Sequence, residues 1–204
     1  LLHPLAKEHI KEEELFEILE SMEQQFLYLY QSYVPKYRQS NWGVLQTTSI
    51  LQNAAWFGEC FCLEEMKRIA EWAKDELLYQ LESQIYGDGS HWEQSMMYHI
   101  EVLNSVTTML VFRKRAGVET SKRIEEILYG MYDYVMHAAG PDHFQIAQGA
   151  SDVTDIRDVM TRGAMLIEES AFKYAGYEEP DLESIWCFGM EQKEQYLKLK
   201  SKQP

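Results

Sequence analysis

The stretch LEEMKRIAEWAKDELLYQLESQIYGDG, residues 63–89, decides the class of fold. Its apolar residues recur every three or four positions, the spacing that places side chains on one face of an α-helix. They are Met66, Ile69, Ala70, Ala73, Leu77 and Leu81. Gly87 and Gly89 then interrupt the pattern within a short turn. The stretch therefore predicts one amphipathic helix over residues 63 to about 85, with its apolar face turned to a core.

The same periodicity extends over most of the chain. Further helices are expected over residues 12–34, 93–115, 120–138, 154–176 and 182–199, and after RQSN at residues 38–41. No stretch alternates for long enough to predict a strand, so the expected fold class is all-α. Helices of this length joined by short polar turns suit antiparallel hairpins, arranged either as a bundle or around a ring as an (α/α) toroid.

Composition and net charge argue against several classes of function. The chain has 204 residues, 46% of them hydrophobic, which suits one domain with a substantial core. Its formal net charge of -14 argues against a nucleic-acid binder or a binder of anionic membranes, because both need a surplus of lysine and arginine. Three cysteines without a companion cluster predict neither a disulfide framework nor a metal site. No secretory signal is visible and the first residue is not methionine, so the compartment stays open.

The pair Asn41-Trp42 is the first candidate for chemistry. Asn41 stands where a helix begins, and asparagine is among the preferred N-cap residues. The functional alternative is a side-chain amide that donates to an anionic ligand at the positive end of the helix. Trp42 is then either a core residue or a stacking platform for a sugar ring.

The second candidate is YGDGSHWEQSMMYH, residues 86–99. Its polar side chains include Ser90, His91, Glu93, Gln94, Tyr98 and His99. Ser90 and Glu93 have the spacing of a capping box, which explains two of them without any function. Gln94 and Tyr98 would share one face of the helix. That face is either solvated surface or the wall of a cleft, where a tyrosine phenol can exchange a proton with a reacting group.

The third candidate is GASDVTDIRD, residues 149–158. Asp152, Asp155 and Asp158 are too widely spaced for a calcium loop, so they are expected to favour a helix start. Arg157 pairs either with one of them or with a substrate carboxylate.

These pieces together resemble the N-terminal helical domain of the heparinase II/III-like polysaccharide lyases. The family typically shows an Asn-Trp or Asn-His pair that opens a helix, then a DG…EQS…YH segment, then a GDSD…D.RD segment. The second piece is complete here, whereas GASD at residues 149–152 replaces GDSD in the third. The resemblance covers residues 38–189, most of the chain.

The resemblance implies an incomplete (α/α) toroid followed by a C-terminal β-sandwich domain. Residues 1–204 are then expected to be a single helical domain, a fragment of a longer two-domain protein without its β-sandwich. The implied activity is that of a lyase that cleaves uronic-acid-containing glycans, heparin- or heparan-like or related, by β-elimination. The expected partners are an anionic oligo- or polysaccharide and the β-sandwich domain, with no cofactor and no metal. The fragment alone is expected to be inactive or weakly active.

The resemblance also assigns roles to residues. Asn41 is expected to neutralise the uronate carboxylate, and Tyr98 to act as the acid, and on some substrate epimers as the base too. Trp42 occupies the position where some members have a histidine that contacts the carboxylate or acts as base. His91, His99 or a residue of the β-sandwich domain would replace that histidine.

Substrate contacts are expected from Trp42, Gln94, His99 and His91, with Glu93 balanced between a capping box and the cleft. The net charge of -14 disfavours encounter with a polyanion, but local cations can line the groove. The candidates are Lys36, Arg38, Arg157 and Arg162.

Two other functions compete with the lyase. One is a glycoside hydrolase on a similar helical toroid that uses paired carboxylates such as Asp88 and Glu93. The other is a non-catalytic glycan-binding helical module.

Overall fold

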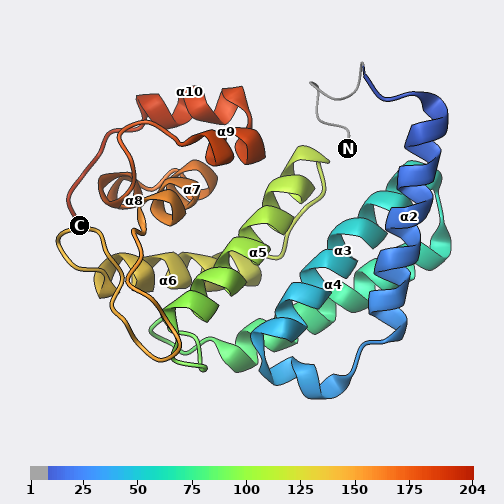
Figure 1. The fold of residues 1–204 in the computed structure, drawn as a ribbon, viewed down its shortest axis with the longest axis horizontal. Coiled ribbons are helices and arrows are strands. Elements are labelled where there is room, and N and C mark those ends of the chain that lie inside the picture. The colour runs from blue at the N-terminus through green and yellow to red at the C-terminus, as the bar shows by residue number, and fades with distance from the viewer. Residues whose placement is uncertain (1–8) are drawn as a thin grey trace.

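The computed structural model describes residues 9–204, and this part of the chain is built from α-helices (Figure 1). The elements are α2 (Glu12–Gln31), the 3-10 helix η1 (Pro35–Gln39), α3 (Asn41–Phe61), α4 (Glu64–Gln84), α5 (Met96–Arg115), α6 (Lys122–Ala138), α7 (Arg157–Ile167), α8 (Ser170–Ala175), α9 (Leu182–Phe188) and α10 (Met190–Lys198). Within residues 9–204 the only β-type pairings are two isolated bridges. The predicted all-α class is confirmed. Residues 1–8 of the expected domain lie outside the described part.

Helices α3 and α4 form the most extensive helix pair, and α2 packs on α3. Helix α5 crosses the middle of the molecule in Figure 1 and contacts α3, α6 and α7. The short helices α8, α9 and α10 gather around α7, on the side opposite to α2. Closure of these hairpins into part of a ring stays a prediction.

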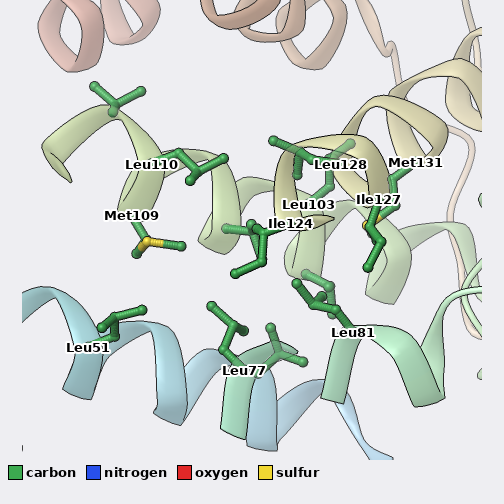
Figure 2. Close-up of a cluster of buried hydrophobic side chains, with 14 of the residues drawn as sticks. Leu51, Leu77, Leu81, Leu103, Met109, Leu110, Ile124, Ile127, Leu128 and Met131 are labelled. Carbon is green, nitrogen blue, oxygen red and sulfur yellow. The ribbon is translucent and has the colours of Figure 1, made fainter. Parts of the chain in front are cut away.

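The core lies between the α3–α4 pair and helices α5 and α6. Figure 2 shows this cluster, in which side chains of α3 and α4 face those of α5 and α6. Its labelled members are Leu51, Leu77, Leu81, Leu103, Met109, Leu110, Ile124, Ile127, Leu128 and Met131. All of them are buried, so the apolar face predicted from residues 63–89 is the face that meets the core.

Two of the predicted long helices are broken in the structure. The helix expected over residues 154–176 begins at Arg157 and ends where Glu168 adopts a left-handed conformation, with φ 61°. The helix expected over residues 182–199 is interrupted at Gly189, with φ 88°. A left-handed residue turns the chain out of the helical path, so each break produces a corner that folds the C-terminal helices back onto α7.

The turn that ends α4 fits closely against α6. Gly89 has φ +86°, and a Cβ atom built on it would lie 2.0 Å from the carbonyl oxygen of Gly130. Only glycine allows this approach without displacing backbone. No helix in the described part is long and apolar enough to cross a membrane.

Candidate functional site

An open groove of about 510 Å³ lies where three separate segments of the chain meet. Its lining residues are Gln39, Ser40, Trp92, Glu93, Gln94, Ser95, Tyr98 and Ala150. They come from the turn before α3, from the segment between α4 and the first turn of α5, and from the loop before α7. Folding therefore brings together the turn before the Asn41-Trp42 pair, the later part of the second motif and the beginning of the third.

Glu93 links two of these segments. Its carboxylate accepts hydrogen bonds from the backbone N–H of Asn41 at 2.8 Å and from the Asn41 amide Nδ2 at 2.9 and 3.2 Å. Asn41 is the first residue of α3, after Ser40 at the N-cap position. The Glu93 carboxylate, 52 residues further along the chain, thus accepts a hydrogen bond from a backbone N–H at the N-terminus of α3, where the helix carries its partial positive charge.

This contact corrects the predicted capping box. Helix α5 begins at Met96, with Ser95 as its N-cap, rather than near Glu93. The Ser90 hydroxyl and N–H donate to Asp88 within the turn, at 2.6 and 3.0 Å. Ser90 therefore stabilises a turn and Glu93 contacts another helix, so the two residues do not form a capping box. Asn41 is likewise the residue after the N-cap, not the N-cap itself.

The beginning of α5 is held by two serines from different parts of the chain. The Ser95 hydroxyl accepts from the N–H of Tyr98 at 3.5 Å, and the Ser151 hydroxyl accepts from the N–H of Met97 at 3.0 Å. The two hydroxyls are 3.0 Å apart. Gly149, with φ +62°, lets the loop approach, because an added Cβ would lie 2.6 Å from the carbonyl oxygen of Gln94. The positive ends of α3 and α5 both adjoin the groove as a result.

Besides its apolar face, helix α4 carries a row of buried polar side chains, and some of these bond to the turn that lines the groove. Glu76, Gln80 and Gln84 are four residues apart and all buried. The Gln84 amide donates to the carbonyl oxygens of Arg38 at 2.7 Å and Ser40 at 3.2 Å. Gln84 is thereby bonded to the turn that lines one side of the groove.

Glu76 anchors the side chain of the same turn. Arg38 donates two hydrogen bonds to the Glu76 carboxylate, at 2.6 and 2.7 Å, and the Tyr33 hydroxyl donates a third. Burial disfavours the charged carboxylate, but the Arg38 and Tyr33 donors outweigh it and hold the pKa of Glu76 below its ordinary value. Burial and the bond to Glu76 raise the pKa of Tyr33 to about 12. The turn is therefore fixed by an ion pair as well as by Gln84.

Of the two residues expected to be catalytic, Tyr98 lines the groove and Asn41 is bonded to a residue that lines it. Tyr98 is partly buried in the first turn of α5 and lines the groove. Asn41 is 7% exposed, is not among the lining residues, and reaches the groove through its bonds to Glu93. Their joint action on a substrate stays a prediction.

Both histidines of the second motif point away from the groove. His91 is 2% exposed, and its Nε2 donates to the Gln84 side chain at 2.9 Å. His99 is 1% exposed, and its Nε2 donates to the carbonyl oxygen of Met131 in α6 at 3.1 Å. Consecutive helical residues point about 100° apart, so His99 faces α6 when Tyr98 faces the groove. Neither imidazole is among the lining residues of the groove, and contact of either with a substrate stays a prediction.

Burial also decides the charge of these histidines. It lowers the pKa of His99 from 6.5 to about 4, against the opposing effect of the Met131 carbonyl. It lowers the pKa of His91 as well, although the charge of Glu93 opposes it. Both rings are therefore neutral near pH 7.

The other expected substrate contacts divide between the groove and the open surface. Gln94 is exposed, has φ 51°, and lines the groove. Trp42 is 65% exposed and lies beside the Tyr37 ring, 6.1 Å between centroids, outside the lining set. Trp92 is 40% exposed and is the tryptophan that lines the groove.

Several groove and support residues were not identified from the sequence. Among them are Gln39, Ser40, Ser95 and Ala150 of the lining, and Glu76, Gln80 and Gln84 beneath it. The polar stripe on α4 did carry a signal, because polar side chains at a constant spacing of four lie beside an apolar face. Ser95 and Ala150 lie within the second and third motifs, but no role was assigned to them, and Gln39 and Ser40 carried no signal of their own.

The cations suggested for the groove are engaged elsewhere. Arg38 binds Glu76, and Arg157 binds Asp155 at 2.5 Å. Arg162 donates to Asn104 and Asp158 at 3.2 Å, and its side chain is 12% exposed. The Lys36 ammonium lies over the ring of Tyr37.

The carboxylate pair suggested for hydrolysis is not assembled in the groove. Glu93 lines it, but Asp88 is not among its lining residues. The Ser90 hydroxyl and N–H lower the pKa of Asp88, which opposes the role of a general acid.

The structure is thus an all-α domain with an open groove, lined by polar and aromatic side chains, at the N-termini of two helices. Residues 4–167 match the family model described as Heparinase II/III N-terminus, and the chain belongs to this family. The family is related to polysaccharide lyases. Searches of curated proteins and of solved structures give no significant match.

Proposed function

We propose that the chain is the helical toroid domain of a lyase that cleaves uronate-containing polysaccharides or oligosaccharides by β-elimination. Family membership supports this proposal. The observation that carries it is the groove itself, in which the Tyr98 phenol and the Glu93–Asn41 contact lie beside the N-termini of α5 and α3.

The reaction explains why such surroundings are needed. A base removes the proton at C5 of the uronate, the electron pair forms the C4–C5 double bond, and the C4–O bond breaks with protonation of the leaving oxygen. Negative charge accumulates on the uronate carboxylate as the C5 proton departs. Hydrogen-bond donors and positive helix ends that already point at this charge stabilise the transition state.

Asn41 supplies one such donor. Its amide group has two N–H bonds that diverge, so one carboxylate receives only one of them well. Glu93 takes that bond and orients the amide, and the second N–H binds the uronate carboxylate. Glu93 is therefore a positioning residue for Asn41.

Tyr98 is the proton carrier. Its phenol protonates the leaving oxygen at C4, and on substrates with the suitable C5 configuration it also removes the C5 proton. Trp92 and Gln94 bind the sugar rings next to it, by stacking and by hydrogen bonding. A C-terminal β-sandwich domain would cover the open side of the groove and supply a remaining base.

The test is Tyr98→Phe in the full-length protein, with formation of the unsaturated product followed by its ultraviolet absorbance. Loss of the phenol is expected to lower the elimination rate by about a hundredfold or more, with folding and glycan binding retained. Tyr174→Phe removes an exposed hydroxyl from α8 and is the matched control.

Elimination by Tyr98→Phe at a near wild-type rate would overturn the assignment. Cleavage that creates new reducing ends without ultraviolet absorbance would instead indicate a hydrolase. Glycan binding without cleavage, unchanged in Tyr98→Phe and Asn41→Ala, would indicate the non-catalytic module.

A further inference from the structure

A closed circuit of hydrogen bonds joins two walls of the groove, and the buried imidazole of His91 is part of it. Its Nε2 bonds to Oε1 of Gln84 at 2.9 Å, and its Nδ1 accepts from the N–H of Glu93 at 3.4 Å. Gln84 donates to the carbonyl oxygen of Ser40, and the next residue, Asn41, donates to the Glu93 carboxylate. From this circuit, and resting on the proposed function, we infer that His91 is a positioning residue for the elimination, acting on the Asn41 amide and on the turn before α3.

The circuit specifies which nitrogen of His91 carries the proton. The Gln84 Nε2 donates to the carbonyl oxygens of Arg38 at 2.7 Å and of Ser40 at 3.2 Å, so both of its amide protons are used. Its Oε1 can only accept, and the proton of the neutral imidazole is therefore on Nε2. The Nδ1 lone pair is left to accept from Glu93. Only this neutral tautomer makes both bonds, and burial, which lowers the pKa of His91, favours the neutral form.

The backbone around His91 holds the ring in place. The N–H of Trp92 donates to the carbonyl oxygen of Gln84 at 2.8 Å, and His91 pairs with Ile85 in an isolated bridge. The N–H of Gln94 donates to the carbonyl oxygen of His91 at 3.0 Å. His91 is therefore anchored to the C-terminal end of α4, and its two ring bonds can fix the positions of both walls relative to that helix.

The two ring bonds serve different parts of the reaction. The bond to the Glu93 N–H fixes the residue whose carboxylate orients the Asn41 amide, the donor for the charge that develops on the uronate. Its loss should lower kcat, because this interaction strengthens in the transition state. The bond to Gln84 fixes the amide that holds the turn with Ser40, which lines the groove. Its loss should raise KM, because the turn shapes the groove before the reaction.

Three substitutions of His91 in the full-length protein separate the two bonds. His91→Asn retains an oxygen that accepts from the N–H two residues further on, as in an Asx turn, but its side chain is too short to reach Gln84. His91→Gln can donate to Gln84 but presents no acceptor where Nδ1 lies. His91→Phe makes neither bond. His137→Phe removes an exposed imidazole from α6 and is the control.

His91→Phe is expected to lower kcat by about tenfold or more and to raise KM several-fold, because small displacements of catalytic groups slow reactions strongly. His91→Asn should restore most of kcat but not KM, and His91→Gln should restore KM but not kcat. Equal changes in His91→Asn and His91→Gln would show that the ring only fills space, and would overturn the inference. A rise in KM alone in all three variants would indicate direct contact with the substrate, and would overturn it as well.

Nuclear magnetic resonance of the wild-type, full-length protein with isotope-labelled histidine tests the circuit without any enzyme activity. Near pH 7 we expect His91 to carry a single proton, on Nε2, with its signals assigned from their loss in His91→Gln. A proton on Nδ1, or a charged ring, would overturn the inference even where the variants do not fold. Absence of any unsaturated product from the wild type would instead overturn the proposed function, and the role of His91 in catalysis with it, whereas the expected tautomer would still support the circuit.

Discussion

His99 should make the domain lose stability as the pH falls from about 6.5 to about 4. The side chain is 1% exposed, and burial lowers its pKa from 6.5 to about 4. Between these values the unfolded chain binds a proton that the folded chain does not. The free energy of unfolding therefore decreases on acidification, and is fully retained only above the unfolded pKa.

The size of the effect follows from the two pKa values. A difference of about 2.5 pH units, at about 1.4 kcal/mol per unit, corresponds to about 3 kcal/mol. This is a large part of the stability of a typical domain. The position of His99 also opposes its protonation, because a cation in the first turn of α5 lies at the positive end of the helix. Burial lowers the pKa of His91 too, so it contributes in the same direction.

The assay is urea unfolding at a series of pH values, followed by circular dichroism, for wild type and His99→Leu. Leucine keeps an apolar group against Tyr134 and removes the titrating ring, and the Met131 carbonyl keeps its bond within α6. The wild type should lose about 3 kcal/mol more than His99→Leu across the window. His137→Leu removes an exposed imidazole from α6 and controls for loss of a histidine as such.

Parallel curves for wild type and His99→Leu would refute the reasoning. They would mean that the folded state accommodates the His99 proton as readily as the unfolded state does. A nuclear magnetic resonance titration of the His99 ring would then place its pKa near 6.5 instead of near 4.

Two further predictions concern the walls of the groove. Gln84→Leu removes the donor to the carbonyl oxygens of Arg38 and Ser40, so urea unfolding should show a loss of about 1–3 kcal/mol, and KM for the proposed elimination should rise. A wild-type KM would show that the turn holds its shape without Gln84. Gly149→Ala introduces a Cβ 2.6 Å from the Gln94 carbonyl at a left-handed position, and should cost about 1–3 kcal/mol and increase proteolysis of the loop before α7. An unchanged digestion pattern would contradict this.

The apolar spacing of the sequence was enough to predict the all-α class and the positions of the longer helices. Helix α4 was expected over residues 63–85 and is observed at Glu64–Gln84, because its helical face and its ending turn are both local properties. The second and third motifs lie in segments that line the groove, whereas the Asn41-Trp42 pair directly follows the turn that does. The breaks at Glu168 and Gly189 were missed, since each depends on the local backbone conformation of a single residue.

Tertiary packing alone decided how the side chains within those segments are used. Glu93 has the spacing of a cap for its own helix, but bonds to the first residue of α3. His99 adjoins Tyr98 in the chain, yet one faces α6 and the other the groove. Sequence periodicity records which face of a helix is apolar, whereas the partner of a polar side chain depends on which distant segment packs against it. That partner lies 52 residues away for Glu93 and 54 residues away for the N–H of Met97, so it is set only when the helices come together.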